Sequence, residues 1–130
     1  MASISTYLEN QVINHVLRNT AYTSPTTVYV ALFTADNGLE GGTITGEVSG
    51  GSYARVAVTF TAPGDGDTSN SAIVTFPTAT ADWGTVTHAA IMDASTAGNV
   101  LIHGALTNSK IVQNGDTFNF NAGDIDFTLV

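Results

Sequence analysis

The sequence has 130 residues, a length typical of a single domain whose hydrophobic core is large enough to need no disulfide bonds or structural metal ions. Three basic residues stand against eleven acidic ones, giving a formal net charge of −8, and this excludes the clustered cations that nucleic acids and anionic membranes require. There is no cysteine for a disulfide framework or a thiolate metal site. We expect one domain over residues 1–130, with no secretory signal in the first thirty residues.

A helix is predicted for residues 5–18, because apolar side chains recur there at helical spacing. Thr6 and Glu9 fit a capping box at its start. The apolar stripe consists of Leu8, Val12, Ile13, Val16 and Leu17. Packing of this stripe on the rest of the same chain is favoured, and docking on a neighbouring subunit is the alternative.

After residue 25 the apolar period changes to two, which is typical of strands. Both faces of segment 26–34 are partly apolar, so it is predicted as a central strand. Residues 35–51 are glycine-rich and acidic and are expected to form a long surface loop, functional or mobile. Segment 53–61 alternates most regularly, with a core face and a second face, wet or in contact with a partner, that carries Tyr53, Arg55 and Thr59.

Further short strands complete a mostly β chain. They are predicted at 71–76, 85–93, 100–106, 109–113, 117–121 and 124–130. Asn114-Gly115 predicts a type I′ hairpin turn, and Trp83 is expected in the core rather than at an interface. About eight strands without a crossover helix predict an antiparallel β-sandwich of jelly-roll or Greek-key type over residues 26–130, preceded by the helix.

Candidate chemical sites are few. His15, His88 and His103 have no partner at metal-ligand spacing. Asp65 and Asp67 resemble the opening of a calcium loop but lack its glycine and distal glutamate, so a solvated acidic turn is favoured. The sequence has no nucleophile elbow and no phosphate-binding turn, and we expect neither an enzyme activity nor a cofactor.

Five segments, in this order, resemble a family of small structural proteins of tailed bacteriophages, labelled tail fibre or head-decoration-like proteins of the Gp80-like type. They are SISTYLENQVINHVLRNTAYTSPTTVYVALFTAD, GGSYARVAVTF, FPTATADWGTVTHAAIMDA, LIHGALTNSK and NGDTFNFNAGDIDFTLV. The resemblance spans nearly the whole chain except residues 36–51. It implies a non-enzymatic virion protein that is assembled in the host cytoplasm, commonly as a trimer or another symmetric assembly.

Among virion roles, capsid decoration is favoured, because the chain has the size of one compact body and shows no shaft or coiled-coil heptads. Such a cement protein would bind the major capsid protein on the outside of the head and stabilise subunit contacts by avidity. We expect a homotrimer. The candidate interface residues are Tyr53, Arg55, Thr59, Leu8 and Val12.

The alternative is a tail-fibre or tail-tip module that recognises a glycan or protein on the host surface. In that case the loops 35–51 and 62–70 would form the site. Exposed aromatic platforms are usual in glycan sites, and Tyr22, Tyr53 or Trp83 would supply one. A small hydrolase is disfavoured, because nothing in the sequence places a base beside a nucleophile.

Overall fold

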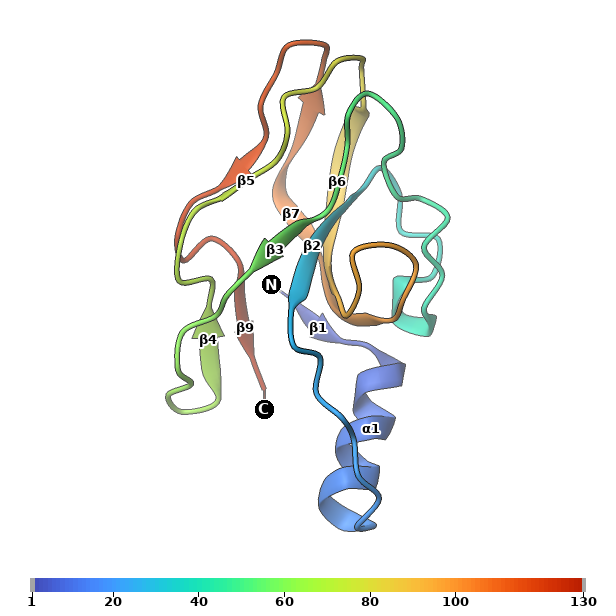
Figure 1. Ribbon diagram of the computed structural model, residues 1–130, viewed down its shortest axis with the longest axis vertical. Helices are drawn as coiled ribbons and strands as arrows, with labels where there is room; N and C mark the ends of the chain where they lie inside the picture. The colour runs from blue at the N-terminus through green and yellow to red at the C-terminus, as the bar shows by residue number, and fades with distance from the viewer. Residues whose placement is uncertain (1, 130) are drawn as a thin grey trace.

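A five-stranded antiparallel sheet, in the order β1-β7-β6-β2-β3, forms the centre of the fold (Figure 1). The computed structural model describes residues 2–129. The strands of the sheet are β1 (Ser3–Ile4), β2 (Val28–Phe33), β3 (Val56–Val58), β6 (Gly84–Met92) and β7 (Val100–Val112). β2 lies between β6 and β3, and its last four residues are buried, which confirms the prediction of an interior strand.

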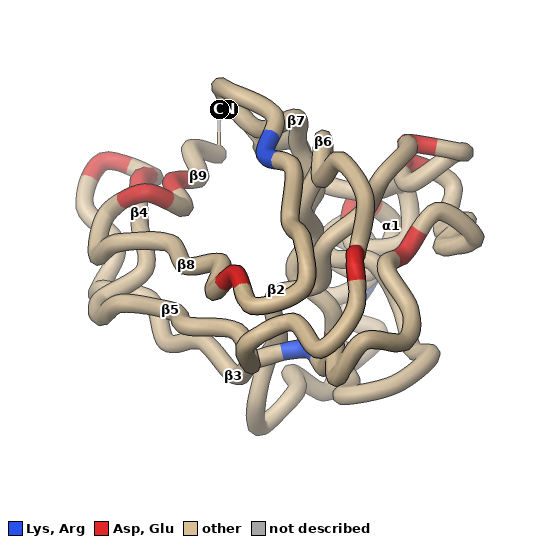
Figure 2. The backbone as a smooth tube through the Cα atoms, turned by 90° about the horizontal axis from the view of Figure 1, so that it is seen from above, with Lys and Arg blue, Asp and Glu red and all other residues tan. Residues whose placement is uncertain are grey.

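Two short strand pairs lie opposite one face of this sheet. One pair is β4 (Asp67–Ser69) with β9 (Asp126–Thr128), and the other is β5 (Val74–Thr75) with β8 (Asn119–Phe120). Figure 2 shows them across an open space between backbones from β2, β6 and β7. Side chains fill much of this space, and Phe76, Trp83 and Phe118 form the aromatic part of the core there.

The other face of the sheet is covered by the segment that was predicted as a long surface loop. This segment contains the 3-10 helix η1 (Leu39–Gly41), and Leu39 is completely buried against β2 and β6 residues such as Phe33 and Met92. Asp36 accepts hydrogen bonds from the backbone N–H groups of Leu39 and Gly38, which hold the pKa of its carboxyl below the ordinary value. The segment is therefore a packed cover of the sheet.

The helix α1 (Thr6–Leu17) confirms the predicted position of the helix but not its packing. Ser5 is the N-cap, one residue before the predicted Thr6, and its hydroxyl oxygen accepts from the backbone N–H of Leu8. No residue of α1 is buried, and the helix extends away from the sheet at one end of the molecule (Figure 1). Leu8 packs against the core as expected, but the rest of the apolar stripe is exposed, so the expectation that it packs on the same chain is wrong for Val12, Ile13, Val16 and Leu17. Within residues 2–129, no helix has both the length and the apolarity to cross a bilayer.

The prediction of a mostly β fold is confirmed, but the predicted arrangement of the strands is not. The described residues form nine strands and one α-helix, so the chain is mostly β as expected. A jelly-roll or Greek-key sandwich is not confirmed, because the pairing gives one open sheet and two separate strand pairs. Segments 100–106 and 109–113 are one strand, β7, interrupted by a register shift against β6. β1 and β4 are too short to leave a periodic signal.

The predicted hairpin at Asn114-Gly115 is also wrong. A turn is present, because the N–H of Asp116 donates to the carbonyl of Gln113 at 2.9 Å. Only Gly115 has a positive φ, of 94°, whereas a type I′ turn needs positive φ at both central residues. The strands on either side do not pair with each other, since β7 pairs with β6 and β1 while β8 pairs with β5.

The side chain and backbone of Asn70 connect the two short strand pairs through hydrogen bonds. Its side-chain amide donates to the carbonyls of Ala72 and Asn121 at 2.8 and 3.0 Å, and its side-chain oxygen accepts from the N–H of Ile125 at 2.9 Å. Its backbone N–H also donates to the carbonyl of Ile125, and its carbonyl accepts from Gly123. With 1% of its surface exposed, Asn70 is a buried polar group whose hydrogen-bonding capacity is used.

Replacing Asn70 by alanine should therefore lower the free energy of unfolding by about 3 kcal/mol, because several partly buried backbone groups lose their partner together. Urea unfolding followed by tryptophan fluorescence measures this loss. Asn121→Ala is the matched control, since Asn121 uses its backbone groups in these contacts and its side chain is exposed, and it should cost less than about 0.5 kcal/mol. Equal losses in the two variants would contradict the role given to Asn70.

Candidate binding cleft and surrounding residues

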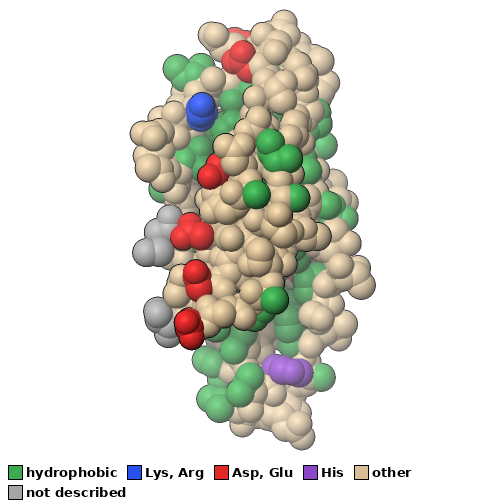
Figure 3. Space-filling model, turned by 90° about the vertical axis from the view of Figure 1, so that its left-hand side faces the viewer, with side chains coloured by type: hydrophobic (Ala, Val, Ile, Leu, Met, Phe, Trp, Pro, Cys, Tyr) green, Lys and Arg blue, Asp and Glu red, His purple; other side chains and the backbone are tan. Residues whose placement is uncertain are grey.

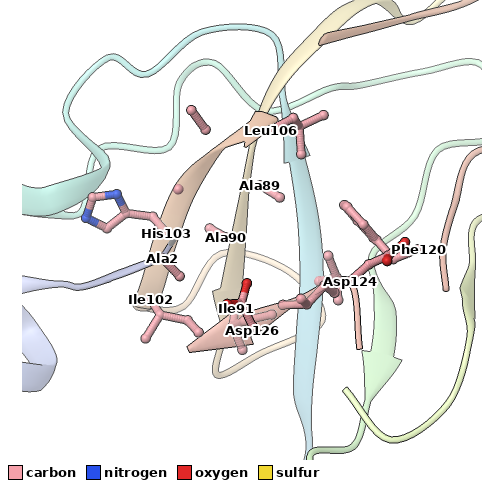
Figure 4. A pocket seen from close by; sticks show the side chains of 14 residues that line it. Ala2, Ala89, Ala90, Ile91, Ile102, His103, Leu106, Phe120, Asp124 and Asp126 are labelled. Atoms are coloured by element: carbon pink, nitrogen blue, oxygen red, sulfur yellow. The ribbon is translucent and has the colours of Figure 1, made fainter. Parts of the chain in front are cut away.

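A cleft of about 70 Å³ lies between the central sheet and the segment that leads into β9 (Figure 4). Its floor is formed by small residues of β6 and β7, including Ala89, Gly104 and Ala105. Phe120 and Ile125 line the opposite side. The cleft exists because small side chains on the sheet face two short strand pairs that do not close over it.

Two carboxylates are the main polar groups of this cleft. Asp124 and Asp126 line it, on the side of the C-terminal segment. Asp124 also accepts a hydrogen bond from the N–H of Asn121 at 2.9 Å, which fixes its orientation. His103 borders the cleft from β7, but its ring is paired with Glu40 at 3.1 Å. A ligand in the cleft would therefore meet hydrogen-bond acceptors and an apolar floor.

The surface beside the cleft is acidic. The β4–β9 pair carries Asp67 and Asp126, and Asp65 lies in the turn before β4. Figure 2 shows acidic residues gathered around β4 and β9, and Figure 3 shows acidic side chains along that side of the molecule. The Asp67 carboxylate accepts from the Thr128 hydroxyl at 2.7 Å. Anionic ligands are disfavoured at this side by the negative field.

The weak calcium candidate at Asp65 and Asp67 gains no further ligands in the structure. Within residues 2–129, no three histidine, cysteine, aspartate or glutamate side chains come together in a way that suits a metal ion. Asp65 adopts a φ of 53° in an exposed turn, as a solvated acidic turn would. The site therefore carries no metal assignment.

Arg55 and Tyr53, both predicted on a wet strand face, point into the subunit instead. Arg55 holds Glu47 with two hydrogen bonds of 2.8 Å, and its remaining terminal nitrogen donates to the carbonyls of Ala94 and Ala97. Only 3% of its side chain is exposed. The hydrogen bonds to Glu47 outweigh the effect of burial and raise the pKa of Arg55 above its ordinary value. Arg55 is thus a structural ion pair, and the wet-face expectation for it is wrong.

The Tyr53 hydroxyl completes this cluster. It donates to Glu47 at 2.7 Å and accepts from the N–H of Leu32 at 3.0 Å, while its ring stacks on Phe76 and meets Trp83 edge-on. Burial, followed by the hydrogen bond to Glu47, raises the pKa of Tyr53 well above its ordinary range. Tyr53 is therefore unsuited to serve as an exposed aromatic platform.

The other predicted site residues divide between surface and interior. Trp83 is 6% exposed and its indole N–H donates to the carbonyl of Gly51, so the prediction of a core tryptophan is confirmed. Thr59 and Val12 are exposed, and Leu8 is half-buried against the core. Tyr22 is half-buried beside the helix. The cleft residue Phe120 was missed, because its alternation with neighbouring polar residues resembles that of any half-buried strand.

The chain matches one protein family along almost its entire length. The family is described as podophage GP4 fiber I protein gp80, and the match covers residues 3–128. The chain belongs to the podophage GP4 fiber I protein gp80 family. The predicted resemblance to phage virion structural proteins is thereby confirmed. No match is found among curated proteins.

Membership of the gp80 fibre family bears on the two virion roles that the sequence left open. The family description names a fibre, so it agrees with the tail-fibre alternative better than with capsid decoration. It also supports a location in the virion. Capsid binding and cement function receive no support from the family description.

The ion pair of Arg55 generates a stability prediction for this fibre-family protein. Arg55→Lys should lower the free energy of unfolding by about 2 to 3 kcal/mol, because one ammonium group cannot reproduce the two bonds to Glu47 and the bonds to two carbonyls. Chemical unfolding of the purified chain measures the difference. Arg18→Lys is the control, since the exposed Arg18 bonds only Asn14 through its side chain, and a change within about 0.5 kcal/mol is expected. A similar loss for both variants would show that Arg55 has no special role.

Proposed function

We propose that this protein is a non-enzymatic binding module of a podophage fibre, and that its cleft takes a neutral sugar of the host surface. The observation that carries the proposal is the placement of Phe120 beside Asp124 and Asp126 over a floor of alanine and glycine. The fibre description of the family agrees with a role in contacting the host.

The chemistry of the cleft favours a neutral carbohydrate over other ligands. Sugars present an apolar C–H face that packs on an aromatic ring or a floor of small residues, and hydroxyl groups that donate to carboxylates. Asp124 and Asp126 provide such acceptors. The net charge of −8 and the acidic β4–β9 side oppose sulfated or phosphorylated glycans. The small size of the cleft suits one or two sugar units rather than a long chain.

Two observations support binding without turnover. Asp124 is oriented by the N–H of Asn121, as expected for a turn-forming aspartate. The nearest histidine, His103, is paired with Glu40 on the far side of β7 from the carboxylates (Figure 4). We therefore assign the cleft carboxylates to hydrogen bonding with sugar hydroxyls rather than to acid and base catalysis.

Saturation-transfer NMR with a panel of neutral oligosaccharides tests sugar binding by the purified chain. We expect at least one member to bind, and Asp126→Asn and Ala105→Phe to weaken it about tenfold, since the first removes a charged acceptor and the second fills the cleft. Asp65→Asn, an acidic residue on the same side but outside the cleft, should leave binding unchanged. Binding that Ala105→Phe does not affect would contradict the cleft, and release of cleaved sugars would contradict the non-enzymatic assignment.

Immunogold electron microscopy of phage particles tests the location in the fibre. An antibody against the chain should label the fibres and leave the head surface unlabelled. Label confined to the head would overturn the fibre assignment and support capsid decoration. This result does not depend on sugar binding, so the location and the ligand are tested separately.

A further inference from the structure

The floor of the cleft contains a hollow between β6 and β7. Ala89 of β6 lies opposite Gly104 of β7, so at this pair one strand contributes a methyl group and the other contributes no side chain. Both residues line the cleft. Two residues away on either side of Gly104, Ile102 and Leu106 also line the cleft and pack against the core. Neighbouring side chains on one face of a strand are about 6 to 7 Å apart, so the hollow is the width of one side chain.

The wall opposite this hollow is apolar and preformed. Phe120 and Ile125 line that side of the cleft. The ring of Phe120 meets the rings of Phe118 and Phe76 edge-on, with centroids 5.1 and 6.5 Å away. Phe118 and Phe76 are both buried in the core. The core therefore fixes the position of the Phe120 ring above the hollow.

The hollow offers no hydrogen-bond partner to a polar group. Strand β6 is paired on both sides, with Ala89 opposite Leu32 of β2 and Gly104 of β7, so its backbone groups have partners within the sheet. The side chains around the hollow are hydrocarbon. A hydroxyl group placed there would lose its water and gain no partner, whereas a methyl group gains from the same burial. The part of a ligand that enters the hollow must therefore be apolar.

The polar side chains of the cleft favour hydrogen-bond donors. Among the described residues that line it, only Asp124, Asp126 and His103 carry polar side-chain atoms. The ring of His103 is engaged by Glu40 at 3.1 Å. The two carboxylates accept hydrogen bonds and donate none. Hydroxyl groups of a ligand can donate to them, but a carbonyl oxygen would find no free side-chain donor.

On the sugar-binding function proposed above, we propose that the cleft selects a 6-deoxyhexose, a sugar with a C6 methyl group in place of the usual hydroxymethyl group. The methyl group fills the hollow over Ala89 and Gly104, and the ring hydroxyl groups donate to Asp124 and Asp126. A hexose in the same position would bury its 6-hydroxyl group against hydrocarbon. The site thus reads the absence of one oxygen atom.

An N-acetylated sugar also carries a methyl group, but it suits the cleft less well. Its acetamido N–H could donate to a carboxylate. The carbonyl oxygen bonded to the same carbon as the methyl group would then lie at the edge of the hollow and need a donor. No lysine, arginine, serine, threonine, asparagine or glutamine side chain lines the cleft in the described part of the chain. The C6 methyl group of a 6-deoxyhexose brings no acceptor with it.

Matched sugar pairs test this selection with the full chain. The methyl glycosides of L-rhamnose and L-mannose differ only in the 6-hydroxyl group, as do those of L-fucose and L-galactose. In NMR titrations we expect the 6-deoxy member of at least one pair to bind about tenfold more tightly than its parent, with the strongest saturation transfer to its C6 methyl protons. Equal binding within both pairs would overturn the proposal, and so would tighter binding of methyl N-acetylglucosaminide.

A variant of the floor tests where the methyl group lies. Ala89→Ser adds one hydroxyl group to the hollow, which gives a 6-hydroxyl group a partner, and should reduce the preference for the 6-deoxy sugar at least threefold. Ala57→Ser is the matched control, because Ala57 is an alanine of β3 outside the cleft, and it should keep the full preference. An unchanged preference in Ala89→Ser would contradict the position given to C6. The titrations of the wild type need no variant, so the proposal stays testable if Ala89→Ser does not fold.

Failure of this inference is distinct from failure of the proposed function. If neutral hexoses bind and 6-deoxyhexoses have no advantage, the cleft remains a sugar site and only the selection of a 6-deoxyhexose is wrong. If no neutral sugar of the panel binds, the proposed sugar site is wrong and the selection is overturned with it.

Discussion

The buried ion pair between Glu47 and Arg55 is the contact on which the rest of the molecule depends. Both side chains are largely removed from water, with 3% of Arg55 and 16% of Glu47 exposed, and a buried charge is tolerated only when it is fully paired. Arg55 meets this condition by bonding both carboxylate oxygens and two carbonyls of the β6–β7 connection. The pair thus joins three segments that are far apart in the sequence.

The same contact indirectly determines where the helix lies. Glu47 ends the segment that covers one face of the sheet, and holding it in place allows Leu39 to fill the second core cluster. Next to Leu39, Glu40 reaches both Thr6 at the start of α1 and His103 on β7. The hydrogen bond from His103 is the largest of the effects that lower the pKa of the Glu40 carboxyl. The position of α1 therefore depends on the packing of this loop together with the hydrogen bonds of Ser5 to Val100 and Leu101 of β7.

The sequence predicted the positions of the helix and strands better than the tertiary contacts that their side chains make. Helical spacing located α1 to within one residue, and alternation located β2, β6 and most of β7, because those signals are local. Alternation in segment 53–61 assigned Tyr53 and Arg55 to a wet face, because it could not show that both would meet Glu47, a contact that forms only in the folded chain. The outward direction of Val12 and Val16 was equally hidden, since a helical stripe looks the same whether it meets its own subunit or another.

The cleft as a whole could not be predicted for a different reason, although alternation in the sequence places Asp124 and Asp126 on one strand face. Its floor consists of alanines and a glycine, which carry no chemical signal in the sequence, and its carboxylates come from a segment about twenty residues away. The family resemblance supplied the virion context but not a choice between head and fibre, because no residue pattern in the sequence is specific to either location. The word fibre in the family description, and not any residue pattern, agrees better with the fibre location.

The shape of the cleft limits what a single copy of the chain can do. A shallow cleft lined by one aromatic ring and two carboxylates offers few contacts, so the affinity of one copy for one sugar is expected to be low. Where a fibre presents several copies of the chain, weak binding at each cleft would multiply on a host surface that repeats the same sugar. Tight attachment would then depend on the number of clefts that reach the surface together rather than on the affinity of each one.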